Sequence, residues 1–187
     1  MQHCGTQTLE TTDLILRKFT LNDTTAMYEN WASDPEVTKY LTWTPHTSPE
    51  ITQLILTEWV KNYANDNYYQ WAIVPKDNNN CPIGSISVVN INEQTSSMTI
   101  GYCIGKKWWH KGFTSQALTK IIAFLFENTD VNRIDAYHAP ENPNSGKVMK
   151  KSGMTYEGTL RQFEKNTQGV CDVCYYSILR TEYIHRK

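Results

Sequence analysis

The sequence predicts an α+β (mixed α/β) protein in which a mixed β-sheet carries helices on both faces. Three observations predict this class. Strand-like segments alternate with helical ones, one helical segment has a long apolar stripe, and no linker, repeat or low-complexity tract divides the chain. We expect a single domain covering residues 1–187, because a chain of 187 residues is long enough to bury one sizeable core.

The first half of the chain contains four expected strands, at residues 14–17, 68–74, 83–91 and 97–104. A first helical region follows residue 20. A second is predicted from Ser48, Pro49 and Glu50, which supply an N-cap, a proline at the first helical position and an acid in the first turn. Behind them, apolar residues recur at helical spacing: Ile51, Leu54, Ile55 and Trp59.

The second half contains the strongest helical signal, which begins after Gly112. Its apolar stripe is formed by Leu118, Ile121, Ile122, Leu125 and Phe126. A short strand is expected at residues 132–138, and another helix starts at Asn142 and Pro143. Two strands, at residues 155–163 and 170–179, complete the expected sheet of seven strands.

Composition excludes several classes of protein. The 18 basic and 19 acidic residues give a formal net charge of −1, which argues against general affinity for nucleic acid or a membrane surface. No apolar run approaches the ~20 residues that span a bilayer, and residues 1–13 do not resemble a signal peptide. We therefore expect a cytoplasmic protein.

Five cysteines, an odd number, are expected to be reduced thiols. Cys171 and Cys174 have CxxC spacing, so a zinc or redox site must be considered. No second ligand pair accompanies them, and they lie in a strand-like segment, which favours two ordinary strand cysteines. The five histidines are scattered without ligand spacing, so no metal is expected.

The stretch GYCIGKKWWHKGFTSQAL, residues 101–118, predicts an anion-binding turn. Gly112 stands where a strand gives way to a helix, whose first N–H groups and positive dipole end can bind phosphate. Lys106, Lys107 and Lys111 add local positive charge. The alternative is an ordinary solvated loop. Neither GxxxxGK[ST] nor GxGxxG is present, which excludes the two familiar phosphate loops.

That stretch is followed by ENPNSGKVMKKSGMTYEGTLR, residues 141–161, and the pair of motifs resembles the GCN5-related N-acetyltransferases (GNAT), in particular the branch that acetylates ribosomal-protein N-termini. The resemblance covers nearly the whole chain. It implies a central, mostly antiparallel seven-stranded sheet that is splayed between its fourth and fifth strands, with acetyl-coenzyme A in the splay. It also implies a homodimer.

The resemblance further implies cofactor contacts. The family's pyrophosphate loop, Gln/Arg-x-x-Gly-x-Gly/Ala, corresponds to Trp109, His110, Lys111, Gly112, Phe113 and Thr114, of which only the central glycine matches. Cys103 and Ile104 correspond to the strand end whose backbone pairs with the pantetheine arm. The resemblance also implies a cofactor contact by Asn142, which belongs to the second motif. A covalent acyl-Cys103 route is disfavoured, because no base adjoins this residue in the sequence.

For the chemistry, the resemblance implies that Ser145, in Asn142-Pro143-Asn144-Ser145, protonates the departing thiolate. Many relatives use a tyrosine, but that position is Met149 here. The resemblance also assigns Glu164 as the general base, with His138, Glu141 or a water chain as alternatives. Asn142 as a helix cap and Glu164 as a solvated residue are the structural readings of the same positions.

The acceptor amine is expected between the early helices, the loop at residues 40–45 and the last hairpin. It is a protein N-terminus or a small amine. Two alternatives stay open: an antibiotic or polyamine acetyltransferase on the same fold, and a non-catalytic acyl-coenzyme A-binding module.

Overall fold

In the computed structural model, which describes residues 1–185, eight strands form one sheet in the order β1-β2-β3-β4-β5-β6-β8-β7. Neighbouring strands are antiparallel, except that β5 and β6 run parallel. The strands are β1 (Leu9–Glu10), β2 (Leu14–Arg17), β3 (Gln70–Pro75), β4 (Gly84–Asn92), β5 (Ser97–Ile104), β6 (Arg133–His138), β7 (Thr155–Asn166) and β8 (Gly169–Leu179).

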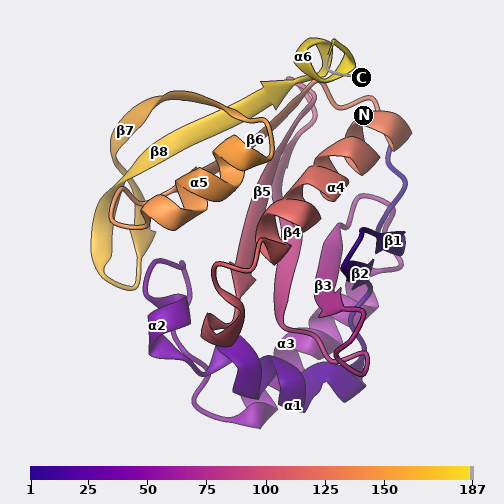
Figure 1. Cartoon of the computed structure of the whole chain (residues 1–187), viewed down its shortest axis with the longest axis vertical. Helices are drawn as coiled ribbons and strands as arrows, with labels where there is room; N and C mark the ends of the chain where they lie inside the picture. Colours follow the sequence, from indigo (N-terminus) through magenta and orange to yellow (C-terminus); the bar gives the residue numbers. More distant parts are fainter. Residues whose placement is uncertain (186–187) are drawn as a thin grey trace.

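Helices occur between the strands and after the last strand of the chain (Figure 1). The α-helices are α1 (Thr24–Met27), α2 (Pro35–Thr38), α3 (Pro49–Asn62), α4 (Phe113–Asn128), α5 (Pro143–Lys151) and α6 (Arg180–Ile184). Two 3₁₀ turns, η1 (Leu21–Asp23) and η3 (Lys106–Trp108), and the π-helical turn η2 (Tyr28–Ala32) complete the set.

The sheet is covered on both faces, as β3 illustrates. Trp71 and Ile73 belong to the large apolar core that includes the buried stripe of α4. Ala72 and Val74 alternate with them and belong to a second core with residues of α1, η2 and α3. Because successive side chains of a strand point to opposite faces, this alternation places helices on both sides of the sheet, as expected.

The seven expected strands are all present, and the mixed sheet with helices on both faces is confirmed. The eighth strand, β1, pairs with β2 over two residues, Leu9 with Leu16 and Glu10 with Ile15. A segment of two residues is too short to show a strand period in the sequence, so it was not predicted.

Helix α3 begins as predicted, with Ser48 at the N-cap and Pro49 as the first helical residue. Of its apolar stripe, however, only Trp59 packs against a core, whereas Ile51, Leu54 and Ile55 are exposed. The helix buries Thr52 and Leu56, while Leu54 is 70% exposed. Thr52 is held inward because its Oγ1 lies 2.8 Å from Nδ1 of His46.

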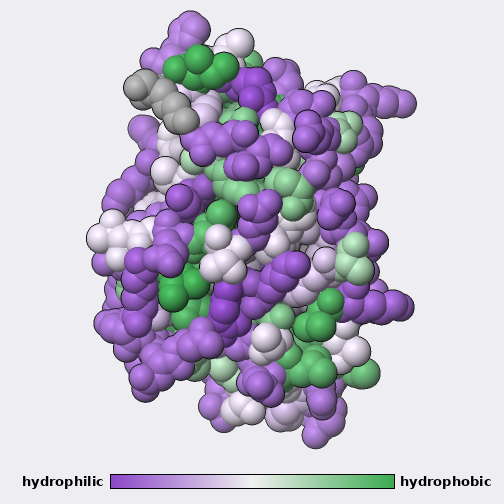
Figure 2. Space-filling view, turned by 90° about the vertical axis from the view of Figure 1, so that its right-hand side faces the viewer, coloured by the Kyte–Doolittle hydropathy of each residue, from purple (hydrophilic) through white to green (hydrophobic). Residues whose placement is uncertain are grey.

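Both ends of the described chain lie at the same end of the molecule, near α6 (Figure 1). The side that carries β1 and β2 is mainly hydrophilic, with small apolar areas between polar side chains (Figure 2). Within residues 1–185, no helix has both the length and the apolar character that crossing a bilayer requires.

Candidate active site

Strands β5 and β6 separate after a short shared segment. They pair in only three positions: Ser97 with Arg133, Met98 with Ile134, and Thr99 with Asp135. Beyond these, β5 continues to Ile104 and β6 to His138. The second half of β5 therefore has an edge without a neighbouring strand, so its backbone N–H and C=O groups can pair with another extended molecule. This is the splay implied by the sequence resemblance.

Hydrogen bonding decides which residues of β5 face the splay. Gly105 N–H, just beyond the strand, donates to Ile83 C=O at 2.8 Å, on the β4 side. The backbone groups of successive strand residues point to alternate sides, so Cys103 also faces β4. The backbone N–H and C=O groups of Tyr102 and Ile104 point into the splay. The sequence indicated Cys103 and Ile104 for backbone pairing, whereas the register directs Tyr102 rather than Cys103 to this edge.

Trp109 stands where the family motif has a polar residue, and the structure gives a reason. Its indole Nε1 donates to the C=O of Ile104 at 2.9 Å. The contact ties the turn before α4 to the end of β5. It also satisfies one carbonyl of the free edge.

Helix α4 begins at an open N-terminus. Gly112 is the N-cap with φ 81°, and a Cβ added to it would meet no heavy atom within 4 Å. The first three helical amides, those of Phe113, Thr114 and Ser115, cannot reach intrahelical acceptors, and no side-chain cap covers them in the described chain. Ser115 instead donates its hydroxyl to the C=O of Gly112 at 2.9 Å. These amides and the helix dipole form an anion-binding geometry.

The positive charge near this helix start differs from the sequence expectation. Lys106 forms an ion pair with Glu36, and the Nζ of Lys107 lies 5.4 Å from the ring centroid of Trp108. Neither lysine lines either of the two cavities described below, and Lys111 does not either. Lys147 and Lys151, both from α5, line the cavity at the start of α4. The sequence contained no signal for them, since it did not show that α5 lies beside α4.

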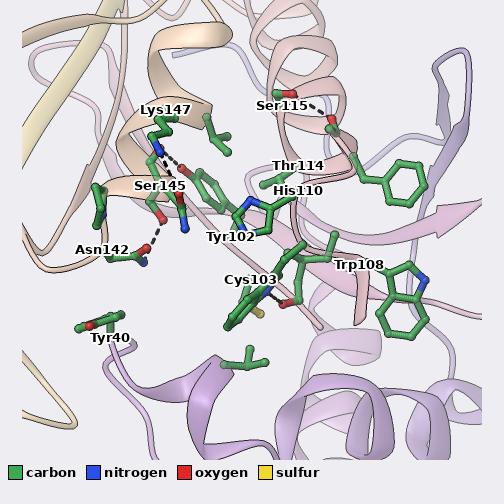
Figure 3. Close-up of a pocket in the computed structure, with 18 of the residues that line it drawn as sticks. Tyr40, Tyr102, Cys103, Trp108, His110, Thr114, Ser115, Asn142, Ser145 and Lys147 are labelled. Carbon is green, nitrogen blue, oxygen red and sulfur yellow. Dashed lines mark hydrogen bonds between the residues drawn. The ribbon is translucent and has the colours of Figure 1, made fainter. Parts of the chain in front are cut away.

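A cavity of about 390 Å³ lies between the start of α4, the end of β5 and the first turns of α5 (Figure 3). Nine residues singled out from the sequence line it: Cys103, Ile104, Trp109, His110, Gly112, Phe113, Thr114, Asn142 and Ser145. Glu141, an alternative base, lies there as well. We refer to this cavity at the start of α4 as the smaller cavity.

A larger cavity, of about 900 Å³, lies between the early helices, the loop at residues 40–46 and the hairpin of β7 and β8. These are the regions expected to bind the acceptor. The two cavities share lining residues and therefore adjoin: Tyr40, Leu41, Tyr102, Cys103, Asn142 and Ser145 line both.

Ser145 is held at this junction by two contacts. Asn142 Nδ2 donates to Ser145 Oγ at 3.1 Å, and Tyr102 Oη donates to Ser145 C=O at 3.0 Å (Figure 3). Asn142 occupies the N-cap position of α5, but its side chain does not cap the backbone. Because the Ser145 hydroxyl accepts from Asn142, its own proton is available for donation to another group. Burial raises the pKa of Tyr102, so its phenol remains a donor.

Glu164 lies in the larger cavity and is bonded on both carboxylate oxygens. Tyr137 Oη donates to Oε2 at 2.7 Å, and Lys165 N–H donates to Oε1 at 2.9 Å. Burial, and then the hydrogen bond to Glu164, raise the pKa of Tyr137, so this phenol is also protonated. Glu164 and Ser145 line the same cavity.

A bulge in β7 sets the position of Glu164. Leu160 pairs with Val173, and the next pair is Glu164 with Cys171, so three residues of β7 oppose one of β8. Gln162, in the bulge, has φ 49° and donates its N–H to Asp172 Oδ1 at 2.9 Å. The two extra residues move Glu164 about 7 Å along the strand, at ~3.4 Å per residue.

His138, an alternative base, also lines the larger cavity. Its Nδ1 lies 2.8 Å from the C=O of Ala139, so Nδ1 carries the proton. Its Nε2 faces Gly146 in α5, where a Cβ would collide with the ring. The ring is thus a packing surface for α5.

The surroundings of Cys103, Cys171 and Cys174 do not favour a nucleophilic or metal site within residues 1–185. Cys103 Sγ lies 3.4 Å from Ser85 Oγ, and burial raises the pKa of the thiol. Cys171 and Cys174 are free thiols three residues apart on β8, so they point to opposite faces of the sheet. Within residues 1–185, no three His, Cys, Asp or Glu side chains are grouped as metal ligands.

Comparison with known proteins gives a family match. The model described as "Acetyltransferase (GNAT) domain" matches residues 13–155. The N-acetyltransferase p20 of Bacillus licheniformis is 35% identical over 181 residues, which are 95% of this chain and 98% of p20. The enzyme that acetylates alanine of ribosomal protein uS5 in Escherichia coli is 34% identical over 64 residues, 34% of this chain and 33% of that enzyme.

Solved structures show the same fold. An acetyltransferase of the GNAT family from Bacillus anthracis has a TM-score of 0.81 at 26% identity, covering 94% of this chain and 100% of its own. RimL, a ribosomal L7/L12 α-N-protein acetyltransferase in complex with coenzyme A, has a TM-score of 0.82 at 21% identity, covering 92% and 98%.

Proposed function

The chain belongs to the GNAT acetyltransferase family and is an N-acetyltransferase, and from this premise we propose that it transfers acetyl from acetyl-coenzyme A to a primary amine by direct attack in a ternary complex. The observation that carries the proposal is the junction of the two cavities at Asn142 and Ser145. One cavity has the anion-binding helix start, and the other has a carboxylate. Acetyl-coenzyme A and the amine would therefore bind in two adjoining cavities that meet at Asn142 and Ser145.

The smaller cavity fits acetyl-coenzyme A chemically. The open amides of Phe113, Thr114 and Ser115 suit the pyrophosphate, as they combine unpaired N–H groups with the positive end of the α4 dipole. The free edge at Tyr102 can pair with the amides of the pantetheine arm. Lys147 and Lys151 supply positive charge beside the same cavity. The complex of RimL with coenzyme A supports this reading.

Acetyl transfer needs a neutral amine and a protonated leaving group. In our proposal, Glu164 accepts a proton from the ammonium, and the neutral amine forms a C–N bond to the thioester carbon. The C–S bond breaks, and the departing thiolate takes a proton from Ser145, directly or through water. The nitrogen of the new amide loses its extra proton, which restores the Ser145 hydroxyl through water, and Glu164 releases its proton to solvent. The hydrogen bond from Asn142 to Ser145 Oγ makes the hydroxyl a better donor.

Calorimetry with acetyl-coenzyme A, followed by a thiol-release assay against a panel of primary amines, tests the proposal. We expect both binding and turnover. Binding without turnover of any amine would favour the acyl-coenzyme A-binding module. Absence of binding would overturn the proposal as a whole.

Replacement of the proton donor tests the mechanism. Ser145→Ala should lower kcat about 10²-fold, the lower end of the usual effect of a general acid, and leave the Kd for acetyl-coenzyme A nearly unchanged. Ser87→Ala, a serine of the larger cavity away from the junction, is the matched control and should keep wild-type kcat. Equal kcat for Ser145→Ala and wild type would contradict the assignment.

Replacement of the base is a separate test. Glu164→Gln should lower kcat/KM and remove the acidic limb of the pH profile of kcat/KM, since an amide cannot accept the amine's proton. If the acidic limb persists in the variant, His138, Glu141 or a water chain is the base instead.

Two finer proposals rest on similarity. The uS5-alanine N-acetyltransferase shares 34% identity with about a third of this chain, which supports a protein N-terminus as one class of acceptor. The family resemblance supports a homodimer. Sedimentation equilibrium measures the mass directly, and a species of 21.6 kDa at micromolar concentration would contradict the dimer.

A further inference from the structure

The larger cavity is lined by few charged side chains, although it is proposed to bind a cation. Within residues 1–185, Glu164 is the only carboxylate that lines it, and no lysine or arginine does. Burial lowers the pKa of His46, so this ring is neutral at neutral pH. His138 already uses its Nδ1 in a bond to Ala139 C=O. The ammonium of a ligand can therefore pair with one carboxylate here, that of Glu164.

The walls of the cavity are largely apolar and aromatic. Trp43, Trp59 and Tyr40 line it from the early half of the chain, and Phe163 and Tyr175 line it from the last hairpin. These residues come from two regions far apart in the sequence, which only the fold brings together. They offer ring faces and edges to a ligand.

Its rim includes exposed apolar side chains beside the polar Asn90. Phe163 is 54% exposed and Val89 is 60% exposed, although both line the cavity. Phe163 is held by its ring contacts, 6.0 Å edge-to-face with both Tyr137 and Tyr175. Val89 is the extra residue of β4 at the shift between Val88 and Asn90. These rim residues carry no charge that could pair with a second charged group of a ligand, so that group would keep its water.

We propose that the acceptor is a primary amine whose part inside the cavity is one ammonium on a bulky apolar or aromatic body without a further charge. This inference rests on the acetyl transfer proposed above and specifies its substrate. The single ammonium pairs with Glu164, and the body contacts the rings of the larger cavity. A polyamine or aminoglycoside would leave its further cations without partners, and an amine with a carboxylate would place that group near Glu164 with no cation to pair with it.

A panel of four amines tests the class: phenethylamine, phenylalaninamide, phenylalanine and spermidine. The first two carry one ammonium on an aromatic body, the third adds a carboxylate and the fourth is a polycation. We expect kcat/KM for the first two to exceed that for phenylalanine and spermidine about tenfold or more, because an unpaired charge would have to be desolvated. Spermidine or phenylalanine equal to phenethylamine would overturn the class.

Calorimetry of the same amines separates failure of this inference from failure of the transferase proposal. Phenethylamine that binds but is not acetylated would support the binding class and contradict the transferase. Spermidine that is acetylated in preference would support the transferase and contradict the class. Absence of binding by all four amines would overturn the class.

A gain-of-function variant provides a sharper test. Asn90 is exposed and lines the larger cavity, so Asn90→Asp adds a second carboxylate without disturbing the core. We expect the ratio of kcat/KM for spermidine to kcat/KM for phenethylamine to rise about threefold or more, since only spermidine has further cations to pair with the new carboxylate. Asn65→Asp makes the same charge change at an exposed residue outside both cavities, and should leave both values unchanged. No selective gain by Asn90→Asp would contradict the charge argument.

A second variant tests the aromatic contact. Phe163→Ala removes an exposed ring, so the fold should tolerate it. We expect KM for phenethylamine to rise about threefold to tenfold through the lost contact area, while KM for acetyl-coenzyme A stays the same. An unchanged KM for phenethylamine would place the aromatic body elsewhere and overturn this part of the proposal.

Discussion

Gly112→Ala tests two roles of Gly112. The glycine adopts a positive φ, and it leaves the first amides of α4 accessible to a ligand. The residue has φ 81°, a conformation that costs an L-residue about 1–2 kcal/mol. A Cβ there would meet no heavy atom within 4 Å, so no steric term adds to this cost. We expect the free energy of unfolding of the free protein to fall by about 1 kcal/mol.

The effect on ligand binding should be larger. The added methyl group lies at the open start of α4, beside the amides of Phe113 and Thr114. Displacing a phosphate by enough to lose one charge-assisted hydrogen bond costs about 1.5–3 kcal/mol, which corresponds to roughly a 10- to 100-fold rise in Kd. Calorimetric titration with coenzyme A measures this Kd, and urea unfolding measures the stability.

Gly169→Ala is the matched control. Gly169 begins β8 at the tip of the last hairpin, has φ 119°, and is also free of heavy atoms within 4 Å of an added Cβ. It lines neither cavity. It should lose at least as much stability as Gly112→Ala while its Kd for coenzyme A stays at the wild-type value. If Gly112→Ala loses stability but binds coenzyme A like the wild type, the amides of α4 are not the pyrophosphate site.

Substitutions at three further residues test the bulge, an ion pair and a helix end. Gln162→Gly should keep kcat and stability, since glycine accepts φ 49°, whereas Gln162→Val should lower kcat by displacing Glu164; equal kcat for the two would contradict a role of the bulge. Glu157→Gln should lower the free energy of unfolding at pH 7 by about 0.5–1 kcal/mol, because the Glu157 carboxylate is partly exposed. The Arg133 guanidinium lowers the pKa of Glu157 from 4.5 to about 2, so this stabilisation is complete above pH 4.5 and is lost as the pH falls toward 2. Acid titrations of the two proteins should therefore converge in that range, and parallel curves would refute the linkage. Arg180→Ala should cost about 2 kcal/mol in urea unfolding, since the guanidinium donates to three backbone carbonyls at 2.7–2.8 Å around the end of α4, while turnover stays unchanged; a loss below about 0.5 kcal/mol would contradict this.

Much of the fold follows from local signals. The stripe from Leu118 to Phe126 predicted α4, and each of its named residues is buried. Ser48 and Pro49 predicted the start of α3, and Gly112 stands before α4 as expected. These features depend on spacing and capping within one or two turns, so the sequence alone contains them.

The charges of the site could not be predicted in the same way. The sequence suggested Lys106, Lys107 and Lys111 because they adjoin Gly112. The structure turns Lys106 to Glu36 and brings Lys147 and Lys151 to the cavity instead. Proximity in the chain does not determine the direction of a long flexible side chain, and the packing of α5 beside α4 is a non-local contact.

The sequence by itself determined the order of strands and helices, the open helix start at Gly112 and the reduced, near-neutral character of the chain, because each depends on residue type and short-range period. Tertiary structure alone decided which edge of β5 Tyr102 faces, where the bulge at Gln162 carries Glu164, and that one carboxylate stands among aromatic walls from both halves of the chain. The physical reason is register: a shift of one or two residues between paired strands redirects every side chain beyond it, and pairing is fixed by the packing of the whole sheet.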